Sequence, residues 1–107
     1  FLAGHAVEGA FPDTIADGLA VRVPHPAALS QILTGVSRII SVSDEAILQA
    51  MKYFFADTRN IAEGAAACTL AALLKEKQVQ RGRKVGLILT GGNVDADLFQ
   101  KALAIKS

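Results

Sequence analysis

A hydroxyl, two glycines and an amide stand together in Thr90-Gly91-Gly92-Asn93, close to the end of the chain. The apolar run at 85–89 comes directly before them, and a continuous apolar run of this length bounded by turn residues is typical of a buried strand. Glycine permits either a positive φ or a close approach of the backbone to another group. Since open α/β sheets bind ligands at the carboxyl ends of parallel strands, this turn is the first candidate for a binding site.

The same turn also has an ordinary structural interpretation. A strand, two glycines and a helix make a common βα connection, and the residues match neither a dinucleotide-binding fingerprint nor a phosphate loop of the GKS or GKT type. Asn93 is then expected to cap the next helix, with Asp95 and Asp97 at its positive end. The pattern alone leaves both interpretations open.

Glu63 is a second residue that could do chemistry, at the start of an alanine-rich segment at 61–75 that predicts a helix. One interpretation is an acid favoured by the positive end of the helix. The other is a carboxylate directed into a pocket, because a helix with so few polar residues is expected to be buried.

Hydrophobic periodicity and turn residues divide the chain into helices and short strands. Pro12 ends a helix tail and loop expected over 1–13. Further helices are predicted at 27–34, after Ser43 as far as a polar connector at 57–60, at 61–75 and at 94–104. Strands are predicted at 36–42 and 85–89, and a short edge strand at 19–23 after the Asp17-Gly18 turn.

Several of these helices have residues at their ends that are typical of helix starts and stops. Pro26 suits the first position of a helix, Gly35 suits a C-terminal end, and Ser43 suits an N-cap. The helix after Ser43 has an apolar stripe at helical spacing, which we expect to face the core. The stripe consists of Ile47, Leu48, Met51, Phe54 and Phe55.

Composition limits the classes of protein that the chain can belong to. The 107 residues suffice for one domain or less, and 51% hydrophobic residues predict a packed core. The formal net charge is +1 with scattered Lys and Arg, so no nucleic-acid partner is predicted. No apolar run reaches the ~18 residues of a membrane-spanning helix, so no membrane partner is predicted.

The cysteine and the histidines exclude two further kinds of site. Cys68 is the one cysteine, so no internal disulfide is possible, and its alanine-rich surroundings suit a small core residue. His5 and His25 are the two histidines, and neither has partners at zinc-ligand spacing, so no metal site is predicted. We expect His5 on a surface loop and a cytoplasmic location for the protein.

The order of elements predicts the α/β class, with a partial parallel sheet and helices packed on it. Two well-defined strands are few for a complete sheet, and the chain begins at Phe1 with no strand before its first turn residues. We therefore expect residues 1–107 to be part of a larger domain.

Four stretches, in this order and at this spacing, give the chain a specific resemblance. They are 14–20 (TIADGLA), 40–47 (ISVSDEAI), 62–67 (AEGAAA) and 89–95 (LTGGNVD). Together they resemble the C-terminal part of the serine/threonine dehydratase and serine racemase family, which consists of fold type II pyridoxal-phosphate enzymes. The resemblance implies that residues 1–107 are the C-terminal segment of a large cofactor-binding domain of the tryptophan synthase beta-like fold.

The resemblance implies cofactor-binding roles for five residues. In the family, a hydroxyl residue at the strand end meets the pyridine nitrogen of pyridoxal 5'-phosphate, and Thr90 matches it where serine is more usual. Gly91, Gly92 and Asn93 match the rest of that turn, and Glu63 matches an acid near the cofactor ring. A hydroxyl donates to an unprotonated ring nitrogen, which makes the ring a weaker electron sink and suits β-elimination.

Other parts of the family's active site have no match here. The family's cofactor lysine, held as a Schiff base in a Ser-x-Lys-x-Arg-like context, is absent, as are the glycine-rich phosphate loop and the acidic residues of a divalent-cation site. No catalytic residue is therefore assigned to this segment. None of its lysines has the required setting: Lys52, Lys75, Lys77, Lys84, Lys101 and Lys106.

Three functional interpretations follow from the resemblance. The first is a lyase that converts L-threonine to 2-oxobutanoate and ammonia, or L-serine to pyruvate, in which this chain alone is inactive and needs the N-terminal half of the same protein. The second is a serine racemase on the same scaffold, and the third is a non-catalytic binding module. Apolar faces left uncovered predict self-association, and a homo-oligomer is expected.

Overall fold

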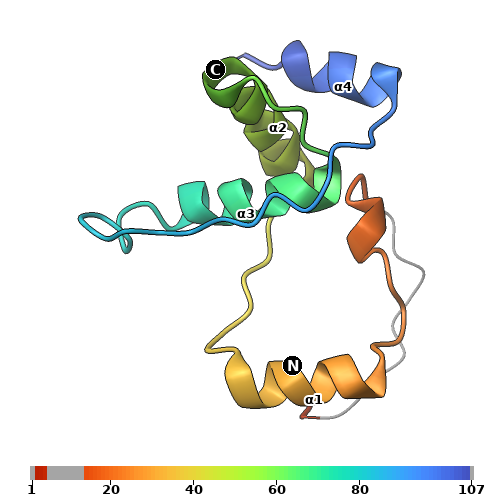
Figure 1. The fold of residues 1–107 in the computed structure, drawn as a ribbon, viewed down its shortest axis with the longest axis vertical. Helices are drawn as coiled ribbons and strands as arrows, with labels where there is room; N and C mark the ends of the chain where they lie inside the picture. Colours follow the sequence, from red (N-terminus) through yellow and green to blue (C-terminus); the bar gives the residue numbers. More distant parts are fainter. Residues whose placement is uncertain (1, 5–13, 107) are drawn as a thin grey trace.

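The computed structural model describes residues 2–4 and 14–106 of the chain. They form the short 3-10 helix η1 (Asp17–Leu19) and the helices α1 (Pro26–Gly35), α2 (Asp44–Thr58), α3 (Gly64–Lys75) and α4 (Ala96–Leu103). Figure 1 shows α2, α3, α4 and η1 gathered together, whereas α1 lies apart on two long connectors. The expectations for residues 5–13, His5 among them, lie outside the described residues.

The core forms where α2 packs against α3 and α4. Met51 is fully buried, and the predicted stripe faces this core, with its two phenylalanines half-buried. The alanines of α3 have no long side chains, so α2 can approach closely. The buried set is Ala16, Ile47, Leu48, Ala50, Met51, Ala62, Ala66, Ala67, Ala71 and Ala102.

Two side-chain contacts fix α4 against α2. The rings of Phe55 and Phe99 meet edge to face, with centroids 5.5 Å apart and planes at 85°. The Lys52 ammonium donates to the carbonyl of Ile105, just after α4. Edge-to-face pairs contribute roughly 0.5–1.5 kcal/mol beyond the area they bury, so this contact defines how α4 lies on α2.

The first helical residue predicted for α1 and the N-cap predicted for α2 are both confirmed. Pro26 opens α1, and the Ser43 hydroxyl accepts from the backbone N–H of Ala46 at 3.1 Å at the start of α2. Gly35 is the last residue of α1 rather than the residue after it. The helix α2 ends at Thr58, beyond the predicted start of the connector, because Arg59 adopts the left-handed conformation (φ 59°) that stops it.

No strand is present in residues 14–106, so none of the three predicted strands is confirmed. Residues 17–19 form η1 where the edge strand was expected to begin, and 36–42 and 85–89 have no ladder hydrogen bonds. A cavity of about 190 Å³ on α3 is lined by Ile40 from the first apolar run and by Val85 and Leu87 from the second. The two apolar runs therefore face α3 without pairing, and β-propensity alone does not supply the hydrogen-bond partners that a strand needs.

Ionic contacts tie the segment at 36–42 to the end of α3. Arg38 and Glu76 form a bidentate ion pair, in which Nη2 lies 2.7 Å from Oε1. The Lys75 ammonium donates to the carbonyl of Ser41 at 2.6 Å. The hydrogen bond from Arg38 lowers the pKa of Glu76 below its usual value.

Two exclusions drawn from composition can be compared with the described part of the chain. None of its helices is long and apolar enough to cross a membrane. Residues 2–4 and 14–106 also contain no group of three His, Cys, Asp or Glu side chains that could hold a metal ion.

Truncation of Met51 is expected to destabilise the chain. Met51→Ala empties a fully buried position, and such substitutions raise the free energy of the folded state by about 2–5 kcal/mol. Val79→Ala is the control, because Val79 is 60% exposed and its truncation should change stability by less than about 0.5 kcal/mol. Urea denaturation measures the free energy of unfolding of both variants. Equal losses of stability would contradict the assignment of the core.

Arg38→Gln is expected to raise the pKa of Glu76 towards its ordinary value. Because folding lowers this pKa, the pair stabilises the fold above the unfolded-state pKa of Glu76, and the contribution is lost as pH falls through the folded-state pKa. NMR titration of the Glu76 carboxyl carbon measures the shift. Arg83→Gln, which removes a charge outside this ion pair, should leave the titration unchanged.

Candidate functional site

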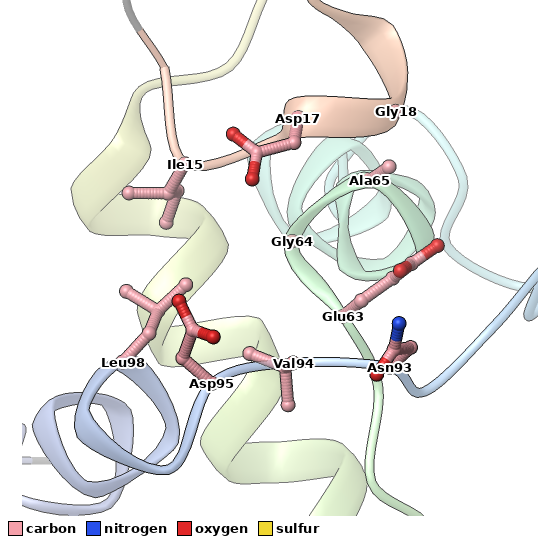
Figure 2. A pocket seen from close by; sticks show the side chains of 10 residues that line it. All are labelled: Ile15, Asp17, Gly18, Glu63, Gly64, Ala65, Asn93, Val94, Asp95 and Leu98. Carbon is pink, nitrogen blue, oxygen red and sulfur yellow. The ribbon is translucent and has the colours of Figure 1, made fainter.

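A cavity of about 220 Å³ opens where η1, the start of α3 and the segment before α4 meet (Figure 2). These segments are far apart in the sequence, so the cavity exists only in the folded chain. Its lining residues are Ile15, Asp17, Gly18, Glu63, Gly64, Ala65, Asn93, Val94, Asp95 and Leu98.

Glu63 lies at the N-cap position of α3, and its side chain makes no capping hydrogen bond. Its backbone N–H donates to the carbonyl of Gly91 at 3.0 Å, which joins the entry of α3 to the predicted turn. The backbone of Glu63 is extended here (φ −74°, ψ 167°), so α3 begins at Gly64 instead of at residue 61. The half-buried side chain lines the cavity, as the second of the two sequence interpretations requires.

Gly92 allows a close approach of two backbones, and Gly91 lies close to the side chain of Glu63. A Cβ on Gly91 would lie 3.0 Å from the Oε1 atom of Glu63, and a Cβ on Gly92 would overlap the carbonyl oxygen of Ile61. Neither glycine has a positive φ. Of the two roles that the sequence allowed for these glycines, the structure therefore assigns close approach.

Thr90 and Asn93 differ in their relation to the cavity. Asn93 lines the cavity, and Figure 2 shows its amide nitrogen directed towards Glu63. The side chain of Thr90 is exposed and lies outside the lining. The predicted cap role of Asn93 is wrong: Asp95 is the N-cap of α4, because the backbone stays extended as far as Asp95 (φ −60°, ψ 143°) and the helix begins at Ala96.

Sequence reasoning missed the wall of the cavity that η1 contributes. Asp17 and Gly18 were interpreted as a turn, yet both line the cavity, and Asp17 lies across it from Asp95 (Figure 2). Gly64 makes room for this wall, since a Cβ there would lie 2.5 Å from the Ile15 carbonyl oxygen. The presence of 14–20 among the four resembling stretches was the one available signal.

The cavity is lined by three carboxylates and one amide, and none of its lining residues is basic. Acceptors of this kind favour a positively charged or hydrogen-bond-donating group and repel an anion. The cavity is therefore suited to an ammonium or hydroxyl group. A phosphate would have to be held by other residues.

Cys68 lies one turn beyond Gly64 in α3. Its thiol donates to the Gly64 carbonyl at 3.4 Å, and partial burial, together with the charge of Asp44, raises the pKa of Cys68. A thiol with a raised pKa holds little thiolate at neutral pH, so Cys68 acts as the small core residue that the sequence indicated.

Comparison with known proteins identifies the family. The family described as "Pyridoxal-phosphate dependent enzyme" matches residues 1–91. The chain belongs to the pyridoxal-phosphate dependent enzymes. The resemblance inferred from the four stretches is thereby confirmed, and so is the cofactor of the family.

Three members of this family illustrate the range of similar proteins. The chain is 38% identical to the beta-hydroxyaspartate dehydratase of Paracoccus denitrificans over 97 residues, which cover 91% of this chain and 30% of that protein. It is 30% identical to the serine racemase of Schizosaccharomyces pombe over 104 residues, which cover 97% of this chain and 32% of that protein. The crystal structure of the T.th. threonine deaminase superposes on this chain with a TM-score of 0.80 at 32% sequence identity. The superposition covers 88% of this chain and 34% of the deaminase chain.

The chain spans about a third of the length of these members of the family. The superposition places the described fold among fold type II enzymes, although the described residues themselves contain no strand.

The residues at the turn are compatible with the ring of the family's cofactor. No group in the described part of the chain hydrogen-bonds to the Thr90 hydroxyl, so it can donate to a pyridine nitrogen. The carboxylates of the cavity are unsuited to the phosphate, in agreement with the missing phosphate loop. The turn thus fits one end of the cofactor.

Gly92→Ala is expected to displace the turn from the entry of α3. The new methyl group would collide with the Ile61 carbonyl, and overpacking of this kind costs about 1–3 kcal/mol. Gly86→Ala is the matched control, since nothing lies within 4 Å of a Cβ there. Chemical denaturation compares the two variants, and equal midpoints would contradict the role assigned to Gly92.

Proposed function

We propose that this chain forms one wall of the active site of an ammonia-lyase that acts on small β-hydroxy amino acids. The preferred reaction converts L-threonine to 2-oxobutanoate and ammonia, and L-serine would give pyruvate. The observation that carries the proposal is the turn at 90–93, which is fixed against Glu63 while its threonine hydroxyl remains exposed.

The cofactor would supply the electron sink for loss of the α-proton and of the β-hydroxyl group. Thr90 would donate a hydrogen bond from its hydroxyl group to the ring nitrogen, and Asn93 would orient the ring from the neighbouring position. A neutral hydroxyl does not hold a proton on that nitrogen as a carboxylate would. The chemistry therefore favours prompt elimination over a long-lived carbanion.

The negative charge of the cavity favours a substrate whose side chain is uncharged. Asp17, Glu63 and Asp95 would attract the substrate's ammonium group and repel a second carboxylate. L-Threonine and L-serine meet this condition, whereas 3-hydroxyaspartate carries the additional negative charge. This argument favours threonine or serine despite the 38% identity to a beta-hydroxyaspartate dehydratase.

The proposal assigns the remaining parts of the site to residues outside this sequence. A cofactor-binding lysine and a phosphate-binding loop would come from the additional two thirds found in similar enzymes. The chain by itself would then be inactive. The exposed apolar side chains of Ile39, Val85 and Ile88 support a surface that is covered by further protein.

Racemisation of serine is the second candidate. It is favoured by the 30% identity to a serine racemase over 97% of this chain. Both reactions begin with loss of the α-proton, and the wall described above would serve either one. They differ in whether the β-hydroxyl leaves.

Thr90→Ala is expected to lower kcat/KM for L-threonine roughly tenfold to a hundredfold, because one hydrogen bond to the ring is lost. The assay uses the protein from the complete reading frame that contains this sequence, and it measures 2-oxo acid and ammonia. Thr90→Ser keeps the hydroxyl and should retain activity. Thr34→Ala, on α1, is the control for removal of an exposed threonine hydroxyl.

Each alternative has its own result in this assay. Unchanged activity of Thr90→Ala would contradict the role of the hydroxyl. Formation of D-serine from L-serine, without release of ammonia, would assign racemisation. A wild-type protein that develops no visible absorbance with pyridoxal phosphate would be a non-catalytic binding module.

A further inference from the structure

The wall formed by residues 15–18 lies at the edge of the core, where Ala16 is buried and η1 packs against α3, but the chain that leads into it needs a further anchor. It reaches the cavity with Ile15, Asp17 and Gly18. The segment has little regular structure of its own, since η1 contains only three residues. What holds it in place therefore decides the shape of the cavity.

The anchor is a short hydrogen-bond network centred on Asp44. The Thr14 hydroxyl donates to Oδ1 of Asp44 at 2.5 Å, and the backbone N–H of Ile15 reaches Oδ2 at 3.4 Å. The N–H of Ala16 in turn donates to the Thr14 hydroxyl at 3.2 Å. One carboxylate thus organises three consecutive residues that enter the cavity wall.

Asp44 is itself rigidly placed. It is the first residue of α2, directly after the Ser43 cap, and Ile47 and Leu48 bury the next turn in the core. On the other side of the network, Ala16 is only 3% exposed. The network thus joins the fixed start of α2 to a wall whose regular structure is limited to the three residues of η1.

We propose that Asp44 is a positioning residue for the ligand cavity. It acts through Thr14 and Ile15 to hold Asp17 and Gly18 opposite Glu63 and Asp95, without touching the ligand. The inference rests on the proposed function in one respect, namely that this cavity faces the cofactor or the amino-acid substrate.

The competing explanation is that Asp44 only stabilises α2 as an acid at the positive end of a helix. Glu45 separates the two explanations, because it is the next acid of the same turn and its side chain is exposed, outside the network that Asp44 forms with residues 14–16. A purely helical role predicts similar effects of Asp44→Asn and Glu45→Gln. A positioning role predicts an effect of Asp44→Asn alone.

The first experiment measures amide hydrogen exchange without cofactor. In the protein from the complete reading frame, Asp44→Asn and Thr14→Val should accelerate exchange at 15–19 roughly tenfold, with exchange in α2 and α4 unchanged. Thr14→Ser keeps the hydroxyl and should behave as wild type, as should Glu45→Gln. Thr14→Val tests the same network if Asp44→Asn lowers overall stability.

The second experiment measures ligand binding by the same variants. Asp44→Asn and Thr14→Val should raise the dissociation constant for pyridoxal phosphate or the KM for L-threonine roughly tenfold, because the wall is misplaced. The kcat at saturation should change less than about twofold, since no group that touches the ligand is removed. Recovery of both constants in Thr14→Ser would support the network.

The two experiments separate failure of this inference from failure of the proposed function. Unchanged exchange at 15–19 in both Asp44→Asn and Thr14→Val would overturn the positioning role, whatever the enzyme does. Equal effects of Glu45→Gln would overturn it as well. A wild-type protein that binds no pyridoxal phosphate would overturn the proposed function, while accelerated exchange would still support the anchor.

Discussion

The structure depends on a close approach of two backbones beside the cavity. The turn at 91–92 lies so near to Ile61 and Glu63 that side chains on its glycines would meet a carboxylate or a carbonyl oxygen. The hydrogen bond from Glu63 to Gly91 closes this contact. Because it fixes the start of α3 relative to the segment before α4, it determines which side chains can face one another across the cavity.

The small residues of α3 extend the same steric principle into the core. Gly64 admits the backbone of Ile15, and the buried alanines further along admit α2. One side of the helix thus receives the cavity wall and another receives the core. A larger side chain at either place would separate the elements that the site needs together.

The electrostatic character of the site follows from this arrangement. Asp17, Glu63 and Asp95 come from three different segments, and together they give the cavity its excess of negative charge. Thr90 is exposed and lies outside the lining of the cavity. The hydroxyl and the carboxylates would therefore act on different groups, the first on the ring of a cofactor and the second on an ammonium group.

The amino-acid sequence by itself determined the helices, the first residue of α1 at Pro26, the N-cap of α2 at Ser43, the apolar stripe of α2 and the family. These features depend on local spacing, or on several motifs in a fixed order. It also offered a pocket-facing Glu63 as one of two interpretations, and a close approach as one of two roles for the glycines. The start of α3 was misplaced because the backbone of Glu63 is extended where it meets the distant turn at Gly91, a contact that local sequence does not reveal.

Only the tertiary structure decided the remaining features. The apolar runs at 36–42 and 85–89 show no pairing, since a strand needs hydrogen-bond partners that local propensity cannot provide. The positions of Asp17 and Asp44 in the site could likewise not be predicted from the sequence, because each depends on partners that are distant in the chain. The hydrogen bond between Thr14 and Asp44 is one example. A linear pattern records which groups are available, but the distances between them are fixed only when the chain packs.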